Sequence, residues 1–242
     1  MQLTDSVYWV GSGECGLSHY KDCHCYLVGS EGDFALIDTG CGIDTRELEA
    51  NISRVTPLTS VRRIFLTHGH ADHSGGAARL AAVTGAELYA SAPEKKLVEE
   101  GDEWALGLTL AKRKGAYPQE YRYTTARVHH SVAHRDVFHI GQLALTALIV
   151  PGHSPAGVCY LLHSPSGTAL FPGDTVFLHG YVSVINCPGC ELSAYRENIS
   201  TLHGLGVDAL FPGHGTWTVR DGQKHLDTAI EHFSTSALPL MR

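Results

Sequence analysis

Short hydrophobic runs alternate with glycine-marked turns over the first forty residues of the chain. The runs 6–11, 24–29 and 33–40 have the length and the flanking glycines of β-strands. The polar turn SEGD between the second and third runs indicates a hairpin. This part of the chain is therefore expected to be β-structure.

Helices are expected to alternate with strands in the next fifty residues. A helix is predicted over about 44–54, and the apolar run 61–67 is typical of a buried strand. A second helix follows, with Ser74 as its N-cap and Gly85 as its stop signal, and then a short strand at 86–90.

The segment 93–125 breaks this alternation. Pro93 is expected to open one helix, and Asp102 to cap another that ends in the basic run 112–114 before a glycine. A tyrosine-rich stretch comes next. We therefore expect a helical insertion at about 93–125.

Strands return from Val137 onward. The main ones are expected at 142–150, 157–162, 168–171 and 207–211. Two helices are expected at about 191–203 and 223–234. Because hairpins come first and helices occur at intervals, the pattern indicates sheets covered by helices, in a single domain over residues 1–242.

Composition and charge narrow the class of protein. Of the 242 residues, 43% are hydrophobic and 18% are charged, which is an ordinary globular balance. The formal net charge of −7 argues against a large nucleic-acid surface. No apolar run approaches the ~18 residues that span a bilayer. The chain is therefore expected to bind neither nucleic acid nor membrane.

The cysteines and the N-terminal sequence bear on location. The start MQLTDSVYWVGSG lacks the basic and apolar regions of a secretory signal. Seven cysteines, an odd number, without such a signal indicate reduced thiols. A cytoplasmic location is therefore expected.

The densest group of metal-binding side chains lies in the stretch FLTHGHADHSGG. His68, His70, Asp72 and His73 directly follow an apolar run there. Neutral imidazole is the commonest protein metal ligand, and carboxylate is its usual partner. A metal site is therefore the first hypothesis, and a polar turn without metal is the alternative.

One turn recurs at the ends of three later strands. Each strand ends in Pro-Gly, and the next residue is His153, Asp174 or His214. Proline ends the pairing of a strand, and glycine permits an unusual backbone angle. Three strands could thereby direct three ligand side chains to one point.

These motifs together resemble the metallo-β-lactamase superfamily. HGHADH, then His153, Asp174 and His214, with the IDTG strand end that contains Asp38, match its pattern in order over nearly the whole chain. The resemblance implies an α/β fold, a four-layer αββα sandwich. It also implies that the site lies at one edge between the two sheets, with the insertion near it.

The resemblance further implies two divalent metal ions, zinc by default, with manganese, iron or cobalt as alternatives. The expected ligands are His68, His70 and His153 for the first ion, Asp72, His73 and His214 for the second, and Asp174 between them. Asp72 and Asp174 are the expected catalytic carboxylates. Asp38 would accept a hydrogen bond from a ligating histidine, and a strand-end turn is the alternative role for it.

The implied reaction is hydrolysis by a hydroxide that bridges the two ions. The expected substrate is a lactone, thioester or carboxylic ester in a small, largely apolar molecule. True β-lactamases of this fold have cysteine or serine in place of Asp174. An aspartate at this position resembles glyoxalase II, the lactonases, and the nucleases and phosphodiesterases instead. Hydrolysis of β-lactams or phosphodiesters, and an iron-dependent oxidation like that of persulfide dioxygenases, stay as alternatives.

The substrate pocket is less defined by the sequence. Its candidate residues are Trp104, Leu108, Tyr117 and Tyr121 in the insertion, and Phe177 and Tyr181 after Asp174. Ordinary helix packing is the alternative role for the residues of the insertion. Exposed loops around it could also pair in a homodimer.

Two further features receive no role in the reaction. His24 could reach toward the site, but a strand histidine with local hydrogen bonds is the preferred interpretation. Cys187 and Cys190 form a CxxC without a second pair, so a structural zinc is not expected. They are interpreted as incidental thiols, with a redox role as the alternative.

Overall fold

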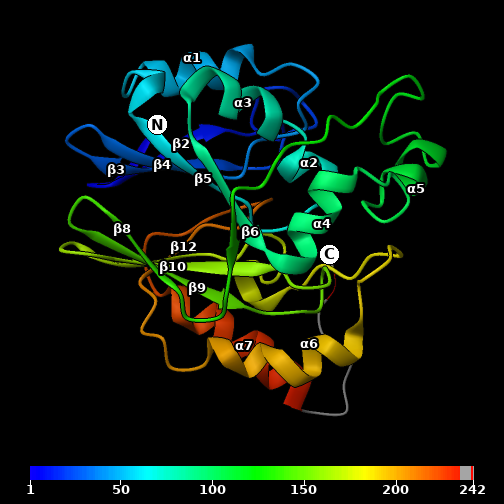
Figure 1. The fold of residues 1–242 in the computed structure, drawn as a ribbon. Coiled ribbons are helices and arrows are strands. Elements are labelled where there is room, and N and C mark those ends of the chain that lie inside the picture. The colour runs from blue at the N-terminus through cyan, green and yellow to red at the C-terminus, as the bar shows by residue number, and fades with distance from the viewer. Residues whose placement is uncertain (235–240, 242) are drawn as a thin grey trace.

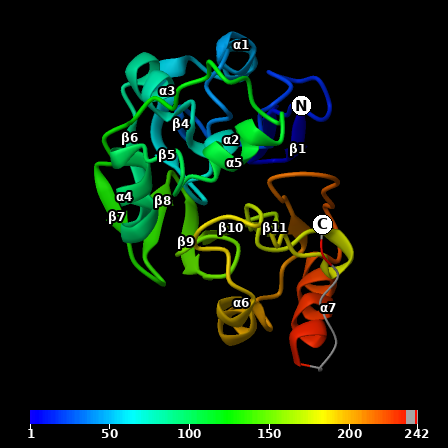
Figure 2. The same cartoon turned by 90° about the vertical axis from the view of Figure 1, so that its right-hand side faces the viewer.

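The computed structural model describes residues 1–234 and 241. Two β-sheets pack face to face, and helices cover the outer face of each (Figure 1). Helices α1 (Arg46–Ser53) and α3 (Ala77–Thr84) lie on one side of the sheets, and α6 (Leu192–Asn198) and α7 (Gly222–Ser234) on the other (Figure 2). The four-layer αββα sandwich is thus confirmed. Of the domain expected over 1–242, residues 235–240 and 242 lie outside the described part.

The first sheet has seven strands in chain order. They are β1 (Gln2–Thr4), β2 (Val7–Gly11), β3 (Cys25–Ser30), β4 (Asp33–Ile37), β5 (Val61–Phe65), β6 (Glu87–Ser91) and β7 (His130–Val132). Neighbours are antiparallel from β1 to β4 and parallel from β4 to β7. Parallel neighbours need crossover connections, and these hold α1, α2 (Ala71–Ser74), α3, α4 (Ala92–Glu100) and α5 (Leu108–Arg113).

The second sheet has five strands in the order β12-β11-β10-β9-β8. They are β8 (Val137–Ile140), β9 (Leu143–Ile149), β10 (Val158–Ser164), β11 (Gly167–Phe171) and β12 (Ala209–Leu210). Only the pair β11 and β12 is parallel, and α6 lies in its crossover. Three short 3₁₀ turns complete the described elements: η1 (Leu58–Ser60), η2 (Leu178–Gly180) and η3 (Ile199–Leu202).

Each sheet buries both of its faces. In β3, Tyr26 belongs to the core between the sheets, while its neighbour Leu27 packs under the helices α1 and α3. In β10, Tyr160 faces the first sheet and Leu161 faces α6 and α7. Successive side chains of a strand point to opposite faces, so two apolar faces per strand produce the near-continuous apolar runs of the sequence.

Two expected helix starts are wrong. Ser74 does not cap a helix; it ends α2, and its hydroxyl donates to Gly69 O at 2.8 Å. Helix α3 begins only at Ala77, because Gly75 and Gly76 pass so close to residues 39–41 that an added Cβ would lie 2.2 Å from a carbonyl oxygen. The helix expected after Asp102 likewise begins later, at Leu108, after the left-handed Gly107.

No helix in the described part of the chain is both long enough and apolar enough to cross a membrane.

Candidate metal centre

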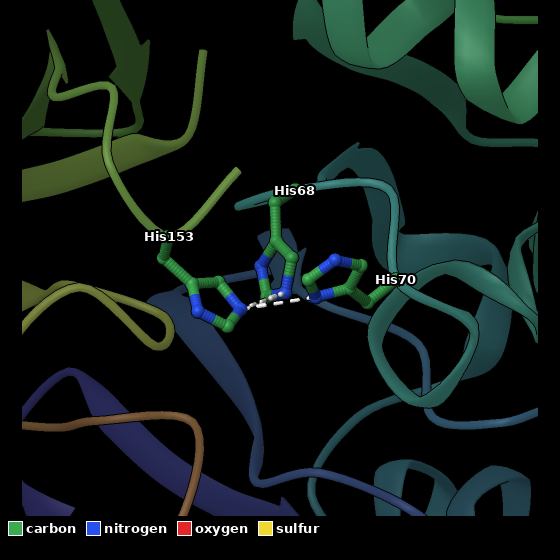
Figure 3. A group of neighbouring side chains, drawn as sticks. All are labelled: His68, His70 and His153. Atoms are coloured by element: carbon green, nitrogen blue, oxygen red, sulfur yellow. Dashed lines mark hydrogen bonds between the residues drawn. The ribbon is translucent and has the colours of Figure 1, made fainter. Parts of the chain in front are cut away.

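Three histidines converge at one edge between the sheets (Figure 3). His68 and His70 come from the loop after β5, and His153 from the loop after β9. His153 Nε2 lies 3.2 Å from His68 Nε2 and 3.0 Å from His70 Nδ1. Ligand nitrogens ~2.0–2.1 Å from a tetrahedral zinc lie about 3.3 Å from one another. The three nitrogens therefore already have the spacing of ligands around one ion.

Burial sets the protonation of this triad. The pKa of all three imidazoles is lowered, chiefly by burial, and that of His70 falls to about 3. A buried imidazole avoids charge because the low-dielectric interior solvates it poorly. The triad is therefore neutral near pH 7, which is the form that binds a metal.

A second group of side chains that could bind a metal lies beside the triad. His214 Nε2 is 3.0 Å from Asp72 Oδ2, and His73 Nε2 is 3.7 Å from the same oxygen. Although burial lowers the pKa of His214, Asp174, Asp72 and Glu14 raise it to about 10. Without metal, this group therefore holds a proton that an ion would displace.

Asp174 faces both groups. Its Oδ1 lies 3.4 Å from His73 Nε2, and its Oδ2 lies 3.8 Å from His153 Nε2. One carboxylate thus points an oxygen toward each set of histidines. The structure brings together all seven side chains that the sequence singled out as ligands.

Two buried atoms test whether these residues fit metal ions. Within the described residues, neither His73 Nε2 nor Asp174 Oδ1 makes a hydrogen bond. Buried polar atoms without partners are rare and costly, and a cation between these two would satisfy both. Gly213 leaves that space open, since an added Cβ would lie 2.4 Å from Asp174 Oδ1. The donor set therefore fits divalent metal.

Asp38 fixes two of the ligand histidines. Its Oδ2 accepts from His73 Nδ1 at 2.8 Å, and its Oδ1 accepts from Thr67 N at 2.8 Å. The Thr67 hydroxyl donates to Asp38 at 2.7 Å and lies 3.0 Å from His68 Nδ1. Both imidazoles are thereby held with Nε2 toward the centre. The structure places Asp38 where the resemblance expected it.

The other ligand histidines have partners that sequence reasoning missed. His153 Nδ1 donates to Ser183 O at 3.1 Å, and His70 Nε2 lies 3.5 Å from Cys187 Sγ. His214 Nδ1 lies 3.5 Å from Glu14 Oε1. Each partner comes from a loop far away in sequence, so only Thr67, next to His68, carried a signal that could have been used.

A cavity of about 300 Å³ opens beside the centre. His70, Asp72, His153 and Asp174 form its polar side. Its apolar wall consists mainly of Leu106, Leu108, Leu110, Ala111, Ala116 and Tyr117 from the insertion and Ile185 from the loop before α6. Leu108 and Tyr117 were expected there. The other wall residues were missed because side-chain direction in the insertion depends on its packing.

Four expected pocket residues do not line this cavity. Trp104 is 54% exposed. Tyr121 lies beneath the wall, where its hydroxyl donates to Cys41 O at 2.6 Å. Phe177 and Tyr181 border a separate cavity of about 350 Å³, together with His179, Gly215 and Thr216.

His24 is not among the clustered ligands. Its Nε2 donates to Gly215 O at 2.8 Å, and its ring packs edge-on against Trp9. Burial lowers the pKa of His24 to about 4, so it is neutral. This histidine holds the loop after His214 in place, which is the local role expected of a strand histidine.

The family of the chain follows from comparison with known proteins. The family model described as the metallo-beta-lactamase superfamily matches residues 21–214. The chain belongs to this superfamily. The fold of this superfamily implies divalent metal binding, and the clustered histidines and aspartates are the candidate ligands in this chain.

Two fungal relatives match most of the chain. The lactamase-like protein nscB of Neosartorya fischeri is 28% identical over 240 residues, which are 95% of this chain and 59% of the relative. The lactamase-like protein adaB of Aspergillus niger is 28% identical over 237 residues, which are 96% of this chain and 61% of the relative. The chain thus spans about three fifths of the length of these relatives.

Solved structures show the same fold. BJP-1, a subclass B3 metallo-beta-lactamase of Bradyrhizobium japonicum, has a TM-score of 0.73 at 22% identity and covers 97% of this chain and 91% of its own. MIM-2 metallo-beta-lactamase has a TM-score of 0.67 at 24% identity, and the match covers 95% of this chain and 83% of the MIM-2 chain.

Proposed function

We propose that this protein is a dinuclear metal-dependent hydrolase that cleaves an ester-type bond, in a lactone, thioester or carboxylic ester, of a small and largely apolar molecule. The observation that carries the proposal is the carboxylate of Asp174, which faces both histidine groups at 3.4 Å and 3.8 Å. A shared carboxylate of this kind suits two ions better than one.

Seven residues would hold the two ions. They are His68, His70 and His153 at the first ion, Asp72, His73 and His214 at the second, and Asp174 at both. When bound, two ions supply a hydroxide at neutral pH and a Lewis acid for the carbonyl oxygen. Imidazole and carboxylate suit zinc, and also manganese, iron and cobalt.

Asp72 is the carboxylate that is accessible to a substrate in the cavity. Its side chain is 28% exposed, against 11% for Asp174, and it borders the cavity. We assign proton transfer to it: after the attack, the carboxylate accepts the proton that remains on the attacking oxygen and returns it to the leaving oxygen or sulfur. His214, at 3.0 Å, holds the carboxylate in place.

The wall of the cavity supports an apolar substrate. Leucines, alanines and Tyr117 face the ligand side chains across a space that suits a small molecule. Lys114, at the edge of the lining, is exposed to solvent. An apolar wall excludes water from the bound part of the substrate, so that the ester bond alone meets the polar side.

The family's name raises hydrolysis of β-lactams as a second candidate, and both solved structures described above are named metallo-beta-lactamases. Asp174 favours esters over β-lactams, because the family resemblance implies cysteine or serine at this position in the true β-lactamases. Phosphodiesterase activity and iron-dependent oxidation of a persulfide are further outcomes to be tested.

Metal analysis and a substrate panel test the proposal. We expect two ions per chain, with turnover of one class among lactones, thioesters and aryl esters. Asp174→Ala should lower the metal content and reduce hydrolysis by several orders of magnitude, because the shared ligand is lost, while circular dichroism stays unchanged. Asp5→Ala, at an exposed turn, is the control.

Other results would redirect the assignment. Turnover of β-lactams or phosphodiesters alone would replace the ester by that class. One iron per chain with oxygen consumption and no hydrolysis would contradict the proposal, as would full activity in Asp174→Ala.

A further inference from the structure

A buried carboxylate outside the ligand set lies behind the first histidine triad. Glu94, in α4, has no exposed surface. No Lys, Arg or His of the described residues forms an ion pair with it. Placing an unpaired charge in the interior is costly unless hydrogen-bond donors surround it. The contacts of Glu94 therefore need an explanation.

Three donors from two loops meet the Glu94 carboxylate. Gly69 N donates to Oε2 at 2.8 Å, while Ser154 Oγ and Ala156 N donate to Oε1 at 2.8 and 2.9 Å. Hydrogen bonds to a charged acceptor are about twice as strong as neutral ones. One side chain thus binds two loops firmly.

These are the loops that carry the triad. Gly69 lies between His68 and His70, and Ser154 directly follows His153. The first loop continues β5 of one sheet, and the second leads from β9 to β10 of the other. Glu94 therefore spans the two sheets at the point where their ligands must meet.

The packing of α4 adds to this restraint. A Cβ at position 69 would lie 3.1 Å from Leu97 Cβ and 3.2 Å from Glu94 Oε2. The loop between His68 and His70 thus lies directly on α4. Ser91, just before the helix, donates to Ala156 O at 2.7 Å and secures the second loop once more.

We propose that Glu94 is a positioning residue that holds His68, His70 and His153 in register, so that the first metal subsite is formed before the ion arrives. This inference rests on the proposed metal ligands. It goes beyond them by assigning the affinity of one subsite to a residue that touches neither ion nor substrate.

Glu94→Gln tests the proposal with little change in volume. An amide keeps one acceptor oxygen and replaces the other by a donor. The new NH2 group must then face a backbone donor, either Gly69 N or Ala156 N, so that one of the hydrogen bonds to residue 94 is lost. Since partners behind metal ligands are typically worth about tenfold to a hundredfold in affinity, we expect a loss of that size at the first subsite.

Two backgrounds separate the subsites. His214→Ala leaves the first triad complete, and His153→Ala leaves the second group. Metal-free proteins are titrated with zinc in competition with a chromophoric chelator. Glu94→Gln should weaken binding in the His214→Ala background and leave it unchanged in the His153→Ala background.

Glu99→Gln is the matched control. Glu99 lies on the same helix and accepts from Val128 N at 3.0 Å, away from the ligand loops. It should change zinc affinity in neither background. Thermal unfolding of the metal-free proteins is recorded alongside, because a purely structural role for Glu94 would lower the melting temperature without favouring one subsite.

In the His214→Ala background, equal zinc affinity with and without Glu94→Gln would overturn the inference. Equal losses of zinc affinity in both backgrounds would also overturn it. If Glu94→Gln does not fold, Ser154→Ala replaces it, since it removes one of the three donors. A loss of zinc affinity that is confined to the first subsite, and smaller than that expected for Glu94→Gln, supports the proposal. An unchanged zinc affinity refutes it. Turnover is not used here. A chain that hydrolyses no ester but shows the selective loss would contradict only the proposed function.

Discussion

The side chains at this centre leave no room for an additional methyl group at Gly213. An added Cβ there would lie 2.4 Å from Asp174 Oδ1 and 2.5 Å from His73 Cε1. Contacts that short do not occur between a Cβ and other heavy atoms, so these two side chains would have to move. The Pro-Gly turn before His214 is thus needed for space as well as for chain direction.

Gly213→Ala should therefore act on the metal centre. We expect loss of about one ion per chain and a fall in hydrolysis of at least tenfold to a hundredfold, the scale of disturbed metal surroundings. Elemental analysis and activity measure both. Gly204→Ala is the control, because it adds backbone strain at a left-handed glycine with open space around it. Two ions in Gly213→Ala would contradict the assignment.

Cys187 allows a finer test. Its Sγ lies 3.5 Å from His70 Nε2, a contact that no pattern in the sequence indicates. Sulfur is a weak acceptor, and a serine hydroxyl accepts a hydrogen bond at least as well. Cys187→Ser should therefore keep nearly full activity, whereas Cys187→Ala should lose several-fold in metal affinity. Chelator competition measures the difference, and an inactive serine variant would point to a role for the thiol itself.

At the scale of elements, the insertion determines the wall of the cavity. Helix α5 and the turn before it supply Leu106, Leu108 and Leu110, whereas the neighbouring Trp104 points to solvent. Which residues face the cavity depends on where α5 begins, and the left-handed Gly107 sets that start. A substrate's fit is thus decided by a helix that contributes no ligand.

Leu108→Ala should raise KM with little change in kcat. Removing one apolar side chain from a binding wall costs roughly 1–3 kcal/mol, or about 10–200-fold in kcat/KM. Steady-state kinetics on the best ester of the panel provides the split. Trp104→Ala, outside the cavity, should leave both constants unchanged. An equal effect of the two substitutions would mean that the substrate binds elsewhere.

The sequence allowed most elements and the seven candidate ligands of the centre to be predicted, because both depend on local patterns. Apolar runs ended by Pro-Gly mark strand ends, and the histidines follow them. It did not allow the start of α3 to be predicted, since the glycines there serve a close approach to residues 39–41. The wall of the cavity and partners such as Glu14 were out of reach because they depend on loops brought together only by folding.

At the scale of the whole molecule, the candidate ligands come from both sheets. The strands of the first sheet use residues 2–132, and those of the second use residues 137–210. His68, His70, Asp72 and His73 follow a strand of the first, and His153, Asp174 and His214 follow strands of the second. Each ion would therefore draw ligands from both sheets.

Metal removal should lower stability. Ligands that bind only the folded state stabilise it by about 2.7 kcal/mol at a hundredfold excess over Kd. We expect dialysis against a chelator to lower the melting temperature measured by calorimetry, and added zinc to restore it. A melting temperature insensitive to the chelator would mean that the centre holds no ion under those conditions.

Among the described strands, the chain passes from one sheet to the other once, at residues 133–136, between β7 and β8. A polypeptide divided there would leave two of the three unshared ligands of each ion on the first fragment and one on the second. Neither fragment would hold a complete set. Reassembly of the fragments and uptake of the ions would then be a single equilibrium, in which zinc acts as a reversible cross-link between the two pieces.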